Sequence, residues 1–288
     1  MSESLKSPFV ANLENQWDKG NFVCVGLDPD LTTIPRSARK RFIFPTRRTI
    51  FNFNKEIIDA TADLACAYKP NSAFYEGYGE QGMQALRKTV AYIKDKYPDV
   101  PVILDAKRGD VGNTNNGYVR SAFDDLGADA VTVNPYLGKE AMQPFLDRKD
   151  KGIIVLAKNS NEGSGEFQDL QVGEGEMPLY QVVARNVAES WNENGNCAVV
   201  VGATYPRELA QVREIVGDMP ILIPGIGAQG GDLGAAVKMG KDSRGQGMLL
   251  SASRGIIYAS DRPDFAIAAR VKMARLVGEI NNYRSVKV

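Results

Sequence analysis

Eight short apolar runs, separated by segments with helical periodicity, constrain the fold of this chain more than any other feature of its sequence. The runs are rich in Val, Ile, Leu and Ala, which is typical of β-strands that are buried on both faces of a parallel sheet. They are FVCVGLD (22–28), LACAYK (64–69), PVILDAK (101–107), DAVTVN (129–134), GIIVLAK (152–158), CAVVVGAT (197–204), PILIPG (220–225) and GMLLSAS (247–253).

Between these runs, apolar residues recur three and four positions apart, as expected for amphipathic helices that cover a sheet. The clearest helical segments are residues 54–63, 82–97, 179–191 and 206–218. Eight strand and helix units in about 250 residues predict an α/β protein of the (β/α)8 TIM barrel class. A doubly wound open sheet is the alternative. We expect a single barrel domain over residues 1–288, with residues 1–20 as an N-terminal helical extension.

Charged residues follow the C-terminal ends of several runs, which is where (β/α)8 barrels carry their catalytic groups. Asp28 ends the first run, Lys69 ends the second, Asp105 and Lys107 end the third, and Arg254 follows the eighth. A single charged residue at a strand end is usually just its first solvated position. Four strands that end in this way together indicate an active site.

The stretch LDAKRGD (104–110) contains an acid, a lysine and a second acid within six positions. Side chains alternate along a strand, so Asp105 and Lys107 are predicted to face the barrel mouth together, roughly 7 Å apart. Asp110 lies beyond the strand, in a turn that Gly109 permits, and either folds back toward the lysine or reaches a neighbouring subunit. Nearby carboxylates favour the ammonium form, so Lys107 is expected to donate a proton and not to form a Schiff base. The alternative is a surface ion-pair ladder of little energetic value.

A glycine-rich loop, IPGIGAQGGD (223–232), follows the seventh run and opens a helical segment. Such loops allow backbone N–H groups to approach an anion, and barrels commonly bind phosphate after strands seven and eight. Arg254 can add a bidentate guanidinium to the same anion. We therefore predict a phosphorylated small-molecule substrate, and we assign Pro224, Gly227 and Gly230 to its binding.

The segment 160–178 is long for a connection in a barrel and contains four glycines. It is interpreted either as a closing lid or as a disordered surface insertion.

Composition argues against several other classes of function. Thirty-five basic residues balance 35 acidic ones, which gives no reason to expect a nucleic-acid or membrane partner, and no apolar run approaches the roughly 20 residues that cross a bilayer. The chain has no histidine, and its three cysteines, Cys24, Cys66 and Cys197, are far apart within apolar runs. We expect buried free thiols, no zinc site, no cofactor and a soluble, cytoplasmic protein. A metal ion bound by carboxylates alone remains the open alternative, and we assign no residue to a metal site.

Taken in order, GLD, YKPN, LDAKRGDVGNT, the serine after the fifth run, PGIGAQGGD and the late arginine resemble the motifs of the orotidine 5'-phosphate decarboxylase family. The resemblance is to the longer branch of that family and covers nearly the full chain. D-x-K-x-x-D alone is shared with sugar-phosphate synthases of the same superfamily, whereas the ordered set is highly specific. The resemblance implies decarboxylation of orotidine 5'-phosphate to uridine 5'-phosphate in de novo pyrimidine biosynthesis.

The same resemblance implies a role for each residue of the charged cluster. Lys69, Asp105, Lys107 and Asp110 would form the catalytic array, and Lys107 would protonate C6 of the pyrimidine. Asp110 and Thr114 would be contributed by the partner subunit of a homodimer.

The resemblance also implies the contacts of the substrate. Asp28 would hold the ribose together with Lys69, and Ser160 would contact the pyrimidine. Gln229 and Arg254 would bind the phosphate.

Two other functions are compatible with a barrel of this kind. A Mg2+-dependent enzyme similar to hexulose-phosphate synthase would need a histidine for its proton chemistry, and this chain has none. In a non-catalytic barrel that binds a phosphorylated ligand, a lysine between carboxylates would have no purpose.

Overall fold

The computed structural model describes residues 7–41, 45–173, 175, 177–226 and 231–285. All eight predicted strands are present and pair in parallel within one sheet, in the order β2-β1-β10-β9-β8-β5-β4-β3. They are β1 (Val23–Gly26), β2 (Ala65–Lys69), β3 (Ile103–Arg108), β4 (Ala130–Val133), β5 (Gly152–Lys158), β8 (Cys197–Val201), β9 (Ile221–Pro224) and β10 (Met248–Ala252).

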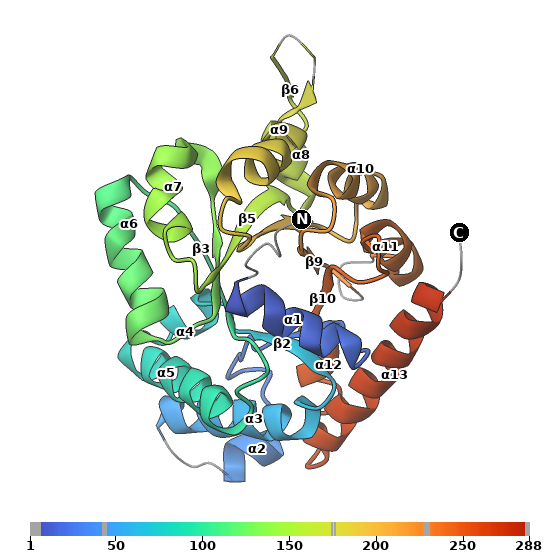
Figure 1. Ribbon diagram of the computed structural model, residues 1–288. Coiled ribbons are helices and arrows are strands. Elements are labelled where there is room, and N and C mark those ends of the chain that lie inside the picture. The colour runs from blue at the N-terminus through green and yellow to red at the C-terminus, as the bar shows by residue number, and fades with distance from the viewer. Residues whose placement is uncertain (1–6, 42–44, 174, 176, 227–230, 286–288) are drawn as a thin grey trace.

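The two end strands of this order, β2 and β3, also lie beside each other. Parallel bridges join Tyr68 to Val102 and Asn71 to Asp105, and the Asp105 N–H donates to the Pro70 carbonyl at 3.0 Å. The sheet therefore closes on itself inside a ring of helices (Figure 1). This confirms the predicted (β/α)8 barrel, and the open-sheet alternative is wrong.

The four predicted helical segments are also present, and all but one of their boundaries agree within three residues. The largest change is at α3, which begins at Thr46 and not at residue 54, because Pro45 occupies the N-cap position. The longer helices are α3 (Thr46–Thr61), α5 (Gly79–Lys96), α6 (Gly112–Val119) with η1 (Arg120–Asp125), α7 (Gly138–Leu146), α9 (Leu179–Asn186) with η4 (Val187–Trp191), α10 (Pro206–Val216), α11 (Leu233–Gly240) and α13 (Phe265–Ser285). The short ones are α2 (Arg36–Arg41), α4 (Ala73–Glu76), η2 (Pro135–Leu137), η3 (Glu162–Ser164), α8 (Gly165–Gln168) and α12 (Arg254–Ile257).

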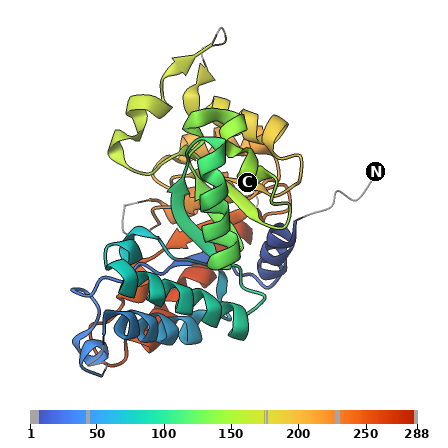
Figure 2. The same cartoon turned by 90° about the vertical axis from the view of Figure 1, so that its left-hand side faces the viewer.

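Helix α1 (Pro8–Asp18) closes the amino-terminal end of the barrel, as the side view in Figure 2 shows. The side chain of Ser7 caps its first turn by accepting a hydrogen bond from the Val10 N–H at 3.3 Å. The ring of Phe9 lies so close to Gly152, the first residue of β5, that a Cβ atom there would be 2.2 Å from it. Access to the barrel interior from this end is therefore blocked by packed side chains.

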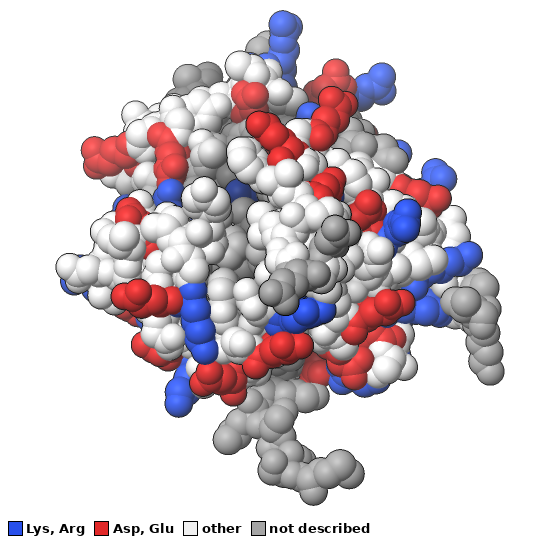
Figure 3. All heavy atoms as spheres, turned by 90° about the horizontal axis from the view of Figure 1, so that it is seen from above, with Lys and Arg blue, Asp and Glu red and all other residues white. Residues whose placement is uncertain are grey.

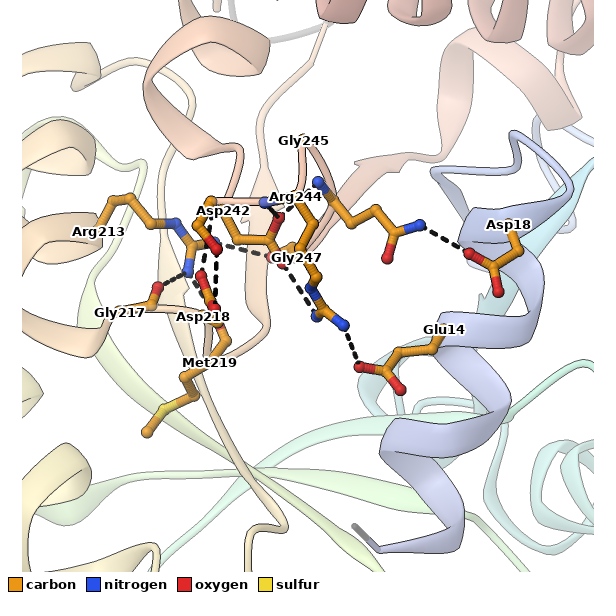
Figure 4. Close-up of polar contacts among 12 residues, drawn as sticks. Glu14, Asp18, Arg213, Gly217, Asp218, Met219, Asp242, Arg244, Gly245 and Gly247 are labelled. Carbon is orange, nitrogen blue, oxygen red and sulfur yellow. Dashed lines mark hydrogen bonds and ion pairs between the residues drawn. The ribbon is translucent and has the colours of Figure 1, made fainter. Parts of the chain in front are cut away.

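A polar cluster at the same end ties α1 to the loops that lead into β9 and β10 (Figure 4). Arg244 bridges Glu14 on α1, at 2.9 Å, and the fully buried carboxylate of Asp242, at 3.1 Å. The half-buried guanidinium of Arg213 donates to the backbone carbonyls of Gly217, Met219, Gly240 and Gly247. Because these bonds satisfy polar groups in the closed end, they stabilise the loops without forming an open site.

The three cysteines, Cys24, Cys66 and Cys197, are free and buried, as the sequence predicted. Burial raises the pKa of the Cys24 and Cys197 thiols to about 12. Both thiols are therefore protonated at neutral pH and are poor nucleophiles.

The surface carries charges of both signs. On the face seen in Figure 3, basic and acidic side chains are interspersed, without a continuous region of one sign among the described residues. Within the described ranges, no helix is both long enough and apolar enough to cross a membrane.

Candidate active site

The charged cluster predicted from LDAKRGD forms at the carboxyl end of the barrel, where β2 and β3 meet. The buried carboxylate of Asp105 accepts from Lys69 Nζ at 2.9 Å through Oδ2 and from Lys107 Nζ at 2.7 Å through Oδ1. The side chain of Lys69 is 8% exposed, whereas that of Lys107 is 49% exposed. One ammonium group is thus enclosed with the carboxylate, and the other is available to a ligand.

The two lysines decide the protonation state of Asp105. Burial alone would raise the pKa of this carboxyl, but the charges and hydrogen bonds of Lys69 and Lys107 outweigh burial and hold the pKa well below its usual range. Burial would likewise lower the pKa of Lys69, but Asp105 and Asp28 reverse the effect and raise it well above its usual range. Asp105 and Lys69 are therefore both ionised at neutral pH.

The backbone at Lys107 departs from the regular strand that the sequence predicted. Its φ of 48° is the only positive value at a non-glycine position among the described residues. Strained backbone of this kind costs about 1–3 kcal/mol and persists where the surroundings fix it. The register of β3 against β4 also shifts between Leu104 and Arg108, so simple alternation does not by itself place Lys107.

Thr132, in the middle of β4, holds this conformation. Its hydroxyl accepts from the N–H groups of Ala106 (3.0 Å) and Lys107 (2.9 Å) and donates to Asp105 Oδ1 at 2.9 Å. The sequence reasoning gave Thr132 no role. The available signal was a single hydroxyl residue in the otherwise apolar stretch AVTV.

Asp110 does not join the cluster within this chain. Its carboxylate accepts from the Val111 N–H at 2.7 Å, and its backbone is fixed by hydrogen bonds to the Asn115 side chain. Gly109 allows the tight turn, since a Cβ atom there would lie 2.7 Å from the Asn134 carbonyl. In the part of the chain that the structure describes, Asp110 makes no ion pair with Lys107, so the fold-back alternative is not observed. Thr114 is exposed on α6.

A cavity of about 240 Å³ opens over the charged cluster. Its polar lining combines Lys69, Asp105, Lys107 and Thr132, from β2, β3 and β4, with Asn159, Ser160 and Asn161, which follow β5. Ser160, predicted to contact substrate, thus lines the same cavity as the lysine and carboxylate array.

A second cavity, of about 510 Å³, continues from the first, because Lys69 and Pro224 line both. Asp28 and Arg254 also line it. The Asp28 carboxylate accepts from the Asn71 N–H at 3.3 Å. The Arg254 side chain is exposed at the start of α12 and has no hydrogen-bond or ion-pair partner among the described residues. The two cavities together form one elongated site with the charged array at one end and a guanidinium at the other.

The structure describes only part of the predicted phosphate loop. Pro224 ends β9 and lines both cavities, and Gly225 has a φ of 101°, a conformation that favours glycine. Gly227, Gln229 and Gly230 lie outside the described residues. Among the described residues, no group of three or more Cys, Asp and Glu side chains is arranged to hold a metal ion.

The segment 160–178 contains regular structure: η3, α8, and the strands β6 (Gln171–Val172) and β7 (Met177–Pro178), which pair antiparallel. In Figure 1 this hairpin projects from the edge of the barrel. The interpretation as a disordered insertion is therefore wrong for the described residues, and closure as a lid stays a prediction.

A family model described as orotidine 5'-phosphate decarboxylase / HUMPS family matches residues 21–268. Proteins named orotidine 5'-phosphate decarboxylase from Cupriavidus metallidurans and Cellvibrio japonicus are 50% and 48% identical to this chain. Each alignment covers 96% of this chain and at least 98% of the relative. The solved structure titled Leishmania donovani OMP decarboxylase has a TM-score of 0.83 and 38% identity, over 97% of this chain and 99% of that one. With most of its length matched by the family model and by these relatives, the chain belongs to the orotidine 5'-phosphate decarboxylase / HUMPS family.

Proposed function

We propose that this protein decarboxylates orotidine 5'-phosphate to uridine 5'-phosphate, a step of de novo pyrimidine biosynthesis. The observation that carries the proposal is the ion pairing of the buried Asp105 carboxylate with two ammonium groups, those of Lys69 and Lys107. The Lys107 side chain is half exposed and lines a cavity. The names of the relatives that match over nearly the whole chain support the same reaction.

The chemistry explains why a lysine is needed at this place. Loss of CO2 from C6 of orotate leaves an electron pair on a ring carbon, without an electron-sink cofactor to delocalise it. A fixed cation beside C6 stabilises that charge as it develops, and the same group can then protonate the carbon. The Lys107 ammonium, held at 2.7 Å from Asp105, performs both tasks.

Asp105 and Lys69 support the same reaction: Asp105 contacts Lys107 directly, and Lys69 acts through Asp105. Asp105 fixes Lys107, and its negative charge lies beside the departing carboxylate of the substrate, where like-charge proximity raises the energy of the ground state. Lys69 keeps the buried Asp105 ionised, because its ammonium is only 2.9 Å away.

The second cavity holds the rest of the nucleotide. Asp28, with Lys69, binds the ribose hydroxyls, and Ser160 binds the pyrimidine edge. Arg254 binds the 5'-phosphate together with Gln229 and the loop residues Pro224, Gly227 and Gly230. Binding energy from the phosphate, which is remote from C6, helps to order the charged array for the chemical step. Orotidine without its phosphate should accordingly be a poor substrate.

The direct test is CO2 release from orotidine 5'-phosphate by the purified chain, measured before and after dialysis against EDTA. We expect rapid release that the chelator does not change, because lysine and carboxylate side chains supply all the proposed steps. Activity that is lost on dialysis and restored by Mg2+ would instead favour the synthase-like reaction. Binding of uridine 5'-phosphate without any turnover would favour the non-catalytic barrel.

We also propose a homodimer in which Asp110 and Thr114 complete the partner's site. Asp110 turns away from Lys107 in its own chain, and the neighbouring side chains of Val111, Tyr136 and Leu137 are 56%, 85% and 45% exposed. Exposed apolar side chains grouped beside a site commonly mark a protein interface.

Subunit mixing tests this arrangement. Lys107→Ala and Asp110→Ala should each be inactive alone, yet unfolding and refolding them together should restore about a quarter of wild-type activity, because half the dimers then contain one intact site. Light scattering should show a dimer for each variant. If the mixed dimers recover no activity, Asp110 acts in the site of its own chain.

A further inference from the structure

Lys158, the last residue of β5, is a buried charge that the proposed mechanism does not use. Its side chain is 0% exposed, and its Nζ forms an ion pair with Asp169 Oδ1 at 2.6 Å. The ammonium also lies 4.5 Å from the ring centroid of Tyr205 and 5.9 Å from that of Tyr180. Burying an ammonium group is costly unless an anion compensates it, so the enclosed position of Lys158 depends on its ion pair with Asp169.

The partner of Lys158 lies on the segment that follows the same strand. Asp169 is the C-cap residue of α8, and its side chain is 49% exposed. The ion pair therefore joins the two ends of the stretch 158–169. Only its lysine end is enclosed in the barrel wall.

The residues between these two ends include part of the lining of the catalytic cavity. Asn159, Ser160 and Asn161 face the cavity that contains Lys69, Asp105 and Lys107. Three hydrogen bonds hold them: from the Asn159 N–H to Gln168 Oε1 (2.9 Å), from Thr204 Oγ1 to the Ser160 carbonyl (3.2 Å), and from Tyr205 Oη to the Asn161 carbonyl (3.2 Å).

Close packing leaves Ser160 little freedom. Gly202 donates its N–H to the Lys158 carbonyl at 2.8 Å, and a Cβ atom on Gly202 would lie 2.6 Å from Ser160 Cα. The backbone at Ser160 thus packs closely against the loop after β8. The ion pair between Lys158 and Asp169 holds the C-terminal end of the 159–169 segment.

We infer that Lys158 is a positioning residue: its buried ammonium, paired with Asp169, fixes the 159–169 segment so that Ser160 meets the pyrimidine ring. This inference rests on the proposed decarboxylase function. Lys158 touches neither the reacting atoms nor the charged array, and it acts through Ser160.

The test uses Lys158→Met, which keeps much of the side-chain volume without the charge, and Asp169→Ala, which changes the half-exposed partner. Each is made alone and combined with Ser160→Ala. Lys55→Met is the matched control, because Lys55 pairs with Asp59 at the same 2.6 Å and lies 5.0 Å from the Tyr92 ring, but is 42% exposed.

Two readouts are needed: kcat/KM for orotidine 5'-phosphate, and hydrogen exchange of the amides of residues 159–169. Lys158→Met and Asp169→Ala should each lower kcat/KM by roughly tenfold or more in the wild-type background, but by less than about twofold in the Ser160→Ala background. Exchange in the segment should accelerate in both variants. Lys55→Met should change neither readout.

Full additivity with Ser160→Ala would overturn the inference, since a general structural role does not depend on that serine. Unchanged exchange in Asp169→Ala would also overturn it, and this variant keeps the test decisive if Lys158→Met fails to fold. If the wild-type chain releases no CO2, the proposed function is refuted. The exchange measurement requires no turnover, so it still decides whether the Lys158–Asp169 pair anchors the 159–169 segment.

Discussion

Replacing Lys107 with alanine is expected to abolish turnover and leave the barrel folded. The variant loses the cation that stabilises the C6 carbanion and also the acid that protonates it, so kcat should fall by at least about 10⁴-fold. The fold should persist, because Lys69 still compensates the buried carboxylate and the Lys107 side chain is 49% exposed. Alanine keeps the left-handed backbone as costly as lysine does, so no relief of strain complicates the comparison.

The measurement is a pair: single-turnover CO2 release, and calorimetric binding of uridine 5'-phosphate. Product binding should survive, whereas substrate binding should weaken, because Asp105 then faces the substrate carboxylate without Lys107. Lys107→Arg is a useful second variant, since it keeps a positive charge but holds its proton too tightly to give it up. Near-normal CO2 release by Lys107→Ala would remove this residue from the mechanism. Loss of both product binding and secondary structure would mean that the cluster is structural.

Replacing Asp105 with asparagine is expected to damage both stability and catalysis. The change leaves the Lys69 ammonium, 8% exposed, without the carboxylate at 2.9 Å. Removing one partner of a buried pair costs about 3–5 kcal/mol in the free energy of unfolding, because the other charge remains buried. Turnover should also be lost, since Lys107 is no longer fixed beside C6.

The stability that is lost in Asp105→Asn depends on pH. The folded-state pKa of Asp105 is depressed, so its contribution to stability is present above its unfolded pKa of about 4 and is lost as the pH falls toward the folded value. The stability gap between wild type and Asp105→Asn should therefore be larger at about pH 7 than at about pH 3 in urea titrations.

Glu193→Gln is the control for Asp105→Asn. Glu193 also pairs with a lysine, Lys139, at 3.0 Å, but its side chain is 74% exposed. This substitution should cost no more than about 1 kcal/mol. Equal losses for the two variants, or a gap that widens in acid, would contradict the buried-pair account.

Much of the architecture could be predicted because it depends on local patterns. Runs such as 152–158 and 197–204 are apolar at consecutive positions, which a strand covered on both faces requires, and helical periodicity separates them. Lys69, Asp105 and Arg254 fall at strand ends, and parallel strands bring their carboxyl ends to the same side of a barrel. The sequence alone therefore predicted that these residues gather in one place.

Spacing in the sequence could not predict which residues from neighbouring strands meet. Thr132 lies 27 positions from Asp105, and their hydrogen bond depends on the register between β4 and β3. The positive φ at Lys107 likewise accompanies a hydrogen bond from its N–H to that threonine, which the local sequence does not reveal.

Lys158 and Asp110 have surroundings that their positions in the sequence did not reveal. In the sequence, Lys158 is a lysine at the end of an apolar strand, as Lys69 is. Its ammonium is nevertheless buried near the rings of Tyr180 and Tyr205 and paired with Asp169, whereas Lys69 lines the active-site cavity. Asp110 belongs to the same short motif as Lys107 but is turned away by the Asn115 contacts. The sequence by itself determined the barrel, its charged end and the residue types of the site, because these follow from periodicity and strand direction. Only the tertiary structure decided which charges meet, because register, turn geometry and packing depend on residues distant along the chain.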